Sequence, residues 1–335
     1  MPWGELVLTI VFLAQTGMGL LGNSALLVVY VRVFISQPHR KKPTDLILTH
    51  LTAVNVVTLL TQGVPSLIFA TGIENIWEEA GCQLLTYIRR VTRGLSICTT
   101  CLLSVFQAIT ISPSTSRCAQ FKSRAPKYIL PSFLFFWILN LSIYMNLLTT
   151  TIVIKNVTIT VSSLNIKYCS NIFWMKYLND MMFLSIITLR DVVFVFLMGW
   201  SSGYMVMVLH RHRKQVQHIH SSSLSPRSSP GSRATQTILL LVTSFICFYW
   251  INCSFNLASN FVEDKDFKLN DIVTFLGACY PSLCPLVLIN SDPPLRWIHY
   301  WVIMGISDSI LLGLRTPAVS YFLLTVWRIY NEVTT

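Results

Sequence analysis

Seven long apolar segments constrain this chain more than any other feature of its sequence. They run over Leu6–Phe34, Thr44–Phe69, Gln83–Ile111, Tyr128–Thr151, Leu178–Leu209, Ala234–Asn260 and Asn270–Asn290. A transmembrane helix needs about 20 mostly apolar residues, and each segment reaches that length. The strands of a membrane barrel would instead alternate over about 10 residues. We therefore predict an all-α membrane protein, in which residues 1–292 form a bundle of seven transmembrane helices.

The composition agrees with a membrane location and argues against soluble classes of protein. Only 12% of the residues are charged and 53% are hydrophobic, whereas soluble domains carry about 25% charged residues. The chain contains no P-loop, G-x-S-x-G, H-E-x-x-H or dinucleotide-binding motif. We expect no enzyme activity, no cofactor and no metal site.

The basic residues predict how the helices are oriented. They gather in the first, third and fifth connections between the apolar segments, which hold Arg40, Lys41, Lys42, Arg117, Lys122, Arg124, Lys127, Arg211, Arg213, Lys214, Arg227 and Arg233. Short loops rich in Lys and Arg stay in the cytoplasm. The N-terminus is therefore predicted to lie outside and the C-terminus inside. Because most of the net charge of +11 serves this asymmetry, we expect the lipid bilayer as a partner and no nucleic acid.

Two features fall on the predicted outer side. The loop after the fourth segment contains the glycosylation sequence Asn156-Val157-Thr158, whereas the matching sequences at Asn140 and Asn252 lie inside apolar segments. Cys82 lies at the outer end of the third segment, just before Gln83, and Cys169 lies in the same outer loop as Asn156. The outside is oxidising, so these cysteines are able to form a disulfide that holds the loop over the bundle. The alternative is two unpaired thiols.

Three arginines occur inside the third apolar segment, where charge is costly. Arg89 and Arg93 are four residues apart and so share one face of a helix. Two guanidinium groups on an inward face would suit a carboxylate or sulfate group of a ligand. The alternative is that they pair with acidic residues or reach the outer headgroups, and Arg90 fits that alternative better.

Arg190 and Asp191 lie in the middle of the fifth segment. Adjacent helical residues point about 100° apart, so we expect that these two do not simply neutralise each other. One of them is expected to pair with another helix. A structural ion pair is favoured for Arg190 over contact with a ligand, and Arg190 is kept as a third candidate ligand residue.

Several motifs resemble one receptor family. Gly22-Asn23 matches a pair typical of G-protein-coupled receptors, and the run from Arg89 to Pro113 resembles the type-1 vomeronasal (pheromone) receptor family. Leu189–Val192, Ser202–Val206 and Arg233–Val242 resemble the same family. The resemblance covers about residues 1–292 and implies a plasma-membrane receptor for pheromone-like or steroid-like small molecules. It also implies coupling to an inhibitory-type heterotrimeric G protein.

The motifs by which rhodopsin-like receptors switch state are replaced in this chain. Ile109-Thr110-Ile111 stands in place of Asp-Arg-Tyr, and Asn55 stands near the position of a usual sodium-binding Asp. Only a two-state outline therefore carries over, in which a ligand favours one helix arrangement. The residues expected to contact the G protein are Lys122, Arg124, Lys127, Arg211, Arg213 and Lys214.

Residues 293–335 depart from the short polar tail that the resemblance implies. The segment is apolar in pieces that are too short to span a membrane. It is consistent with an interfacial helix or with a tail not shaped by receptor function, and the second case implies a nonfunctional product. A second alternative class is a small-solute transporter or channel, in which the membrane arginines and Asp191 would line a path.

Overall fold

The fold is almost entirely helical, as the apolar segments predict. The computed structural model describes residues 3–36, 42–70, 79–113, 119–153, 169–171, 177–219, 230–261 and 267–291. Its elements are α1 (Trp3–Ser36), α2 (Pro43–Ala70), α3 (Glu79–Ile111), α4 (Ala119–Lys122), the 3-10 helix η2 (Ala125–Tyr128), α5 (Ile129–Tyr144), α6 (Leu147–Thr150), β1 (Thr151–Val153), β2 (Cys169–Asn171), α7 (Tyr177–Ile219), α8 (Pro230–Phe261) and α9 (Phe267–Ser291).

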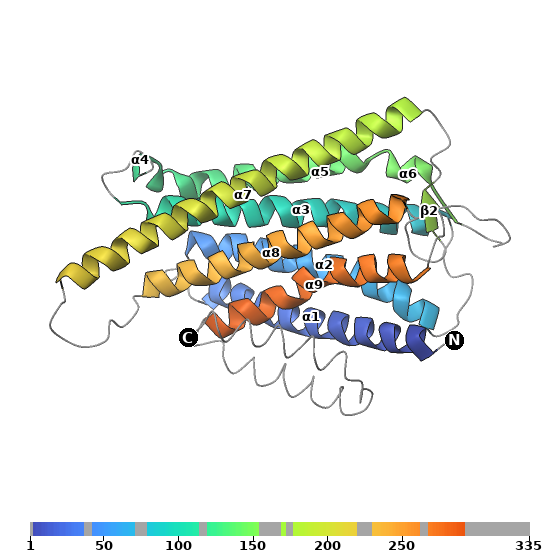
Figure 1. Cartoon of the computed structure of the whole chain (residues 1–335), viewed down its shortest axis with the longest axis horizontal. Helices are drawn as coiled ribbons and strands as arrows, with labels where there is room; N and C mark the ends of the chain where they lie inside the picture. Colours follow the sequence, from blue (N-terminus) through green and yellow to red (C-terminus); the bar gives the residue numbers. More distant parts are fainter. Residues whose placement is uncertain are drawn as a thin grey trace.

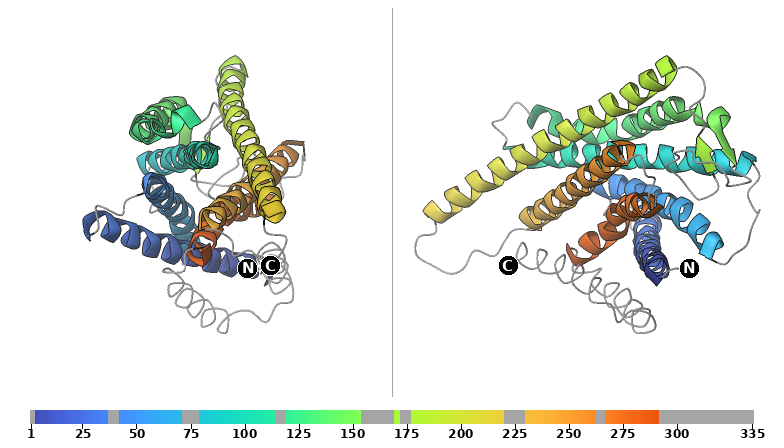
Figure 2. Two further views of the ribbon diagram at one scale, coloured as in Figure 1. Left: turned by 90° about the vertical axis from the view of Figure 1, so that its left-hand side faces the viewer. Right: turned by 45° about the vertical axis from the view of Figure 1, so that its right-hand side comes forward.

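The long helices lie side by side in one bundle, with α3 at its centre (Figures 1 and 2). α3 contacts α2, α5, α7 and α8, and most of its residues are buried. α7 instead exposes most of its apolar surface, which in a bilayer faces lipid. Figure 1 places the N-terminal end of α1 and the strand β2 at one end of the bundle and α4 at the other.

The predicted transmembrane segments are confirmed. In the described part of the chain, six helical segments are long and apolar enough to cross a membrane, and α9 contributes a shorter apolar stretch, Thr274–Asn290. The helix bounds lie within a few residues of most predicted limits because the bilayer sets both the length and the polarity of a spanning helix. The chain therefore forms a seven-helix, multi-pass membrane protein.

The fourth segment was predicted as one helix from Tyr128 to Thr151, and that prediction is wrong at its C-terminal end. α5 ends at Tyr144, and after a turn and α6 the chain enters β1. β1 pairs antiparallel with β2, with Val153 opposite Cys169. The three residues of β1, Thr151, Ile152 and Val153, are all β-branched and favour extended backbone over helix.

The connection after the fifth segment also differs from the sequence prediction. The fifth segment was predicted to end at Leu209, but α7 continues to Ile219, so Arg211, Arg213 and Lys214 lie on a helix. The residues after Leu209 include Arg, Lys and Gln, which are good helix formers, and no Gly or Pro. Pro230 is the first residue of α8, a position where the missing N–H costs nothing.

Gly22 and Asn23 join α1 to α9 at a proline. Pro285 has no N–H, so the carbonyl of Pro281, four residues earlier, lacks its usual partner in the helix. The Asn23 Nδ2 donates to that carbonyl at 2.9 Å. A Cβ at residue 22 would lie 2.9 Å from the ring of Pro285, so glycine permits the close approach of the two helices.

Candidate functional site

The three arginines of α3 form a cationic group inside the bundle, here called the arginine cluster (Arg89, Arg90 and Arg93). All three side chains are partly buried. The guanidinium groups are close enough to repel one another, as the four-residue spacing of Arg89 and Arg93 predicts. The guanidinium carbon of Arg93 lies 5.9 Å from the ring centre of Tyr249 on α8, the geometry of a cation–π contact.

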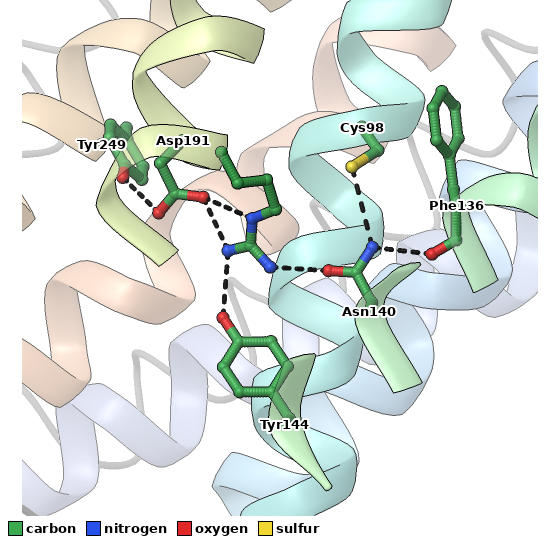
Figure 3. Close-up of polar contacts among 7 residues, drawn as sticks. Cys98, Phe136, Asn140, Tyr144, Asp191 and Tyr249 are labelled. Atoms are coloured by element: carbon green, nitrogen blue, oxygen red, sulfur yellow. Dashed lines mark hydrogen bonds and ion pairs between the residues drawn. The ribbon is translucent and has the colours of Figure 1, made fainter. Parts of the chain in front are cut away.

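Arg190 on α7 sits at the centre of a hydrogen-bond network that reaches two neighbouring helices (Figure 3). Its Nη1 donates to Asn140 Oδ1 at 2.7 Å, and its Nη2 donates to the Tyr144 hydroxyl at 3.0 Å. Both partners lie on α5 and are buried. Arg190 itself is only 7% exposed, so these contacts replace the water that a guanidinium group normally holds.

Arg190 also pairs directly with Asp191, so the expectation that these neighbours do not neutralise each other is wrong. The Asp191 Oδ1 accepts hydrogen bonds from Arg190 Nε at 2.8 Å and from Nη2 at 2.6 Å. The angle of about 100° between adjacent residues describes where two side chains leave the helix. An arginine side chain is long enough to turn back to its neighbour.

Asp191 extends the network to α8. Its second oxygen, Oδ2, accepts a hydrogen bond from the Tyr249 hydroxyl at 2.6 Å. The Arg93 guanidinium lies over the ring of the same Tyr249. The expected pairing with another helix is therefore also present, through Tyr249 for Asp191 and through α5 for Arg190.

Gly94 makes this arrangement possible. It follows Arg93 on α3, at the point where α3 faces Asn140 and Arg190. A Cβ at residue 94 would overlap Asn140 Oδ1 and lie 2.7 Å from Arg190 Nη1. The absence of a side chain at this position lets the network lie directly against the α3 backbone.

The structure shows three members of the network that the sequence reading did not assign, namely Asn140, Tyr144 and Tyr249. From the sequence, Asn140 was identified only as part of a glycosylation sequence inside an apolar segment. In the structure it is fully buried. An amide inside a long apolar segment is itself a signal, because a polar group at that depth needs a partner. The sequence around Tyr144 and Tyr249 does not distinguish them from the other aromatic residues of the transmembrane segments.

The basic residues predicted to contact a G protein lie on exposed positions at one end of the bundle. Lys122 ends α4, and Arg124 and Lys127 lie at or within η2; all three are exposed. Arg211 and Lys214 are exposed on the C-terminal part of α7. Arg213 lies on the same part of α7, but the structure does not describe its side chain. Figure 1 shows α4 and this end of α7 on the same side of the bundle.

The cysteines fall into two groups. Cys98 and Cys101 are buried free thiols that pack in the core. Cys82 is fully buried and disulfide-bonded. Its predicted partner Cys169 begins β2, which contacts α3, but the Cys169 side chain lies outside the described ones, so that pairing stays a prediction. Asn156 and residues 292–335 also lie outside the described residues.

A single bundle of seven membrane helices is the architecture of G-protein-coupled receptors. The chain matches the vomeronasal organ pheromone receptor family over residues 7–329. This match extends past residue 292 into the C-terminal segment. The chain belongs to this family of chemosensory receptors.

Three relatives align with this chain over most of their length. The chain is 38% identical to human vomeronasal type-1 receptor 4 over 86% of this chain and 96% of that protein. It is 36% identical to rat vomeronasal type-1 receptor 90, over 84% of this chain and 90% of the rat protein. It is 32% identical to zebrafish olfactory receptor class A-like protein 1, over 85% of this chain and 89% of that protein. The resemblance inferred from the motifs is therefore confirmed.

Proposed function

We propose that this receptor binds a small anionic, pheromone-like ligand through the arginine cluster and activates an inhibitory-type heterotrimeric G protein. The observation that carries the ligand proposal is the charge of the cluster. Arg89, Arg90 and Arg93 lie close together on α3 and repel one another. Among the residues that the structure describes, Asp191 is the carboxylate that attracts Arg90. Among the side chains that the structure describes, guanidinium groups outnumber carboxylates at this site. Such an excess favours an anion, since arginine binds carboxylate and sulfate with two parallel hydrogen bonds.

Within this site, Arg89 and Arg93 are the proposed ligand contacts, and Arg190 is the weaker candidate. Arg190 already donates four hydrogen bonds inside the protein, to Asp191, Asn140 and Tyr144. An arginine has five N–H groups, so little donor capacity is left for a ligand. Its contacts support a positioning role in which it holds Asp191 near the cluster.

The ligand proposal predicts that Arg93→Ala lowers the potency of anionic ligands about tenfold or more and leaves surface expression intact, because the substitution removes one charged contact. Cells that carry the variant are compared with wild type in a G-protein activation assay, using a panel of volatile compounds and sulfated steroids. Arg32→Ala, at an exposed arginine near the end of α1, is the matched control and should respond as wild type does. Joint loss of response and surface expression would show that Arg93 is structural.

The same cells separate the receptor from the alternative classes. A receptor of this kind activates a G protein when ligand is added, and pertussis toxin, which modifies inhibitory-type G proteins, removes that response. A transporter or channel would instead move solute in a flux assay without G protein. No response to any member of the panel, together with no flux, would favour a nonfunctional product.

The basic residues proposed to contact the G protein are Lys122, Arg124, Lys127, Arg211, Arg213 and Lys214.

The proposed orientation places the N-terminus and the loop after α5 outside the cell, with Asn156 glycosylated and Cys82 bonded to Cys169. Asn156→Gln is then expected to remove the mass shift that a glycosidase produces on gel electrophoresis. Ser254→Ala destroys the sequence at Asn252, which is only 3% exposed, and should leave the shift unchanged. A wild-type protein without any shift would contradict glycosylation at Asn156.

A further inference from the structure

We propose that Asp191 is the internal counter-ion of the arginine cluster and limits how tightly the cluster binds an anionic ligand. The proposal rests on the function proposed above and assigns a second, opposing role within the same site. The arginines would attract the ligand, and Asp191 would repel it. Affinity would then depend on a carboxylate that does not touch the ligand.

The contacts of Asp191 place its charge beside the cluster. Oδ1 is held by Arg190 Nε and Nη2, and Oδ2 is held by the Tyr249 hydroxyl. The Arg93 guanidinium lies 5.9 Å from the centre of that same Tyr249 ring, and Arg90 is electrostatically attracted to Asp191. One tyrosine side chain therefore separates the carboxylate from a proposed ligand contact.

This arrangement fixes the position of the negative charge. Arg190 binds Asn140 and Tyr144 on α5 as well as Asp191, so the pair cannot rotate away from the cluster without losing those bonds. Inside a membrane bundle, charges are weakly screened and interact strongly over several ångströms. Asp191 also neutralises Arg190, so it removes one positive charge from the surroundings of the cluster. With Asp191 uncharged, the charge of Arg190 would add to the attraction that Arg89 and Arg93 exert on a sulfate or carboxylate.

Tyr249 adjusts the same balance in the opposite direction. A carboxylate oxygen only accepts hydrogen bonds, so the Tyr249 hydroxyl is the donor and spreads the charge of Oδ2. Phenylalanine at this position would keep the ring beneath Arg93 but remove that donor. The negative potential of Asp191 at the cluster would increase, and an anionic ligand would bind more weakly.

The proposal therefore predicts effects of opposite sign at two bonded residues. Asp191→Asn keeps an oxygen for Arg190 and removes the repelling charge, so it should tighten anion binding about tenfold. Tyr249→Phe should weaken anion binding severalfold. A network whose role is merely structural would weaken binding in both variants.

The probe is estrone 3-sulfate, with uncharged estrone as its matched control, and binding is measured on purified full-length receptor in lipid nanodiscs. We expect tighter binding of the sulfate to Asp191→Asn than to wild type, weaker binding to Tyr249→Phe, and no change for estrone. Equal or weaker binding of the sulfate to Asp191→Asn overturns the proposal. If wild type binds the sulfate normally in that case, only the role of Asp191 fails; if neither protein binds it, the anionic-ligand proposal fails as well.

Tyr249→Phe keeps the proposal testable if Asp191→Asn does not fold. This substitution removes one hydroxyl from a partly exposed residue and should preserve the bundle. Weaker binding of the sulfate with unchanged binding of estrone supports the proposal. Equal losses for both steroids, or no loss for the sulfate, overturn it.

Discussion

Gly94→Ala is expected to reduce the folded receptor at the cell surface to less than about a tenth of the wild-type level. The new methyl group would overlap Asn140 Oδ1 and crowd Arg190 Nη1, and both atoms belong to side chains held by several hydrogen bonds. Neither can move away without breaking those bonds inside the bundle. Overpacking of a core costs about 1–3 kcal/mol, and the loss of buried polar contacts adds to that cost.

The measurement is surface labelling by flow cytometry, together with fluorescence-detected size-exclusion chromatography of a tagged receptor. Two glycines of α7 provide matched controls. A Cβ at Gly199 or Gly203 would meet nothing within 4 Å, and both residues are exposed. Gly199→Ala and Gly203→Ala should therefore express as wild type does. Normal expression of Gly94→Ala would show that α3 and α5 are not packed as closely as the structure indicates.

The transmembrane helices could be predicted from sequence because the bilayer imposes simple rules on them. A spanning helix must be long and apolar, and its backbone must satisfy its own hydrogen bonds. The limits of α2 and α9 lie within three residues of the predicted ones. The C-terminal part of α7 was missed, because beyond the membrane no such rule applies and helix propensity alone decides.

The candidate site could be predicted only in part. The cost of charge in a membrane marked Arg93, Arg190 and Asp191, and the helical repeat placed Arg89 beside Arg93. The repeat could not show that Arg190 folds back on Asp191, because that contact depends on the conformation of a long side chain. Nor could it show that Tyr249 lies between Asp191 and Arg93, since that position depends on how α8 packs in the bundle.

The arrangement around Arg190 indicates how ligand binding would reach several helices. The network joins α5, α7 and α8, and Gly94 brings it against α3. A ligand on the arginine cluster would act on Asp191 through charge. Asp191 lies on α7 and is hydrogen-bonded to Arg190 on the same helix and to Tyr249 on α8. A ligand shifts a conformational equilibrium only as far as it binds one state better.

Arg190→Met is expected to destabilise the receptor by about 3–5 kcal/mol, the usual cost of removing one partner of a buried ion pair. Methionine keeps an unbranched, apolar side chain that reaches about as far as Nε of arginine, and it donates no hydrogen bonds. Asp191 would keep its charge and lose two of its hydrogen bonds, and Asn140 Oδ1 and the Tyr144 hydroxyl would lose the donor that now reaches them. The midpoint of thermal unfolding of the solubilised receptor should fall accordingly.

Two further variants separate the charge of Arg190 from its geometry. Arg190→Lys keeps the positive charge, but a single ammonium group cannot match the planar fork that reaches Asn140, Tyr144 and Asp191 together, so an intermediate loss is expected. Leu189→Met introduces the same methionine at the preceding residue, which is 66% exposed and faces lipid, and should leave the midpoint unchanged. If Arg190→Lys is as stable as wild type, the charge alone holds Asp191 in place. If Arg190→Met is as stable, the network does not stabilise the bundle.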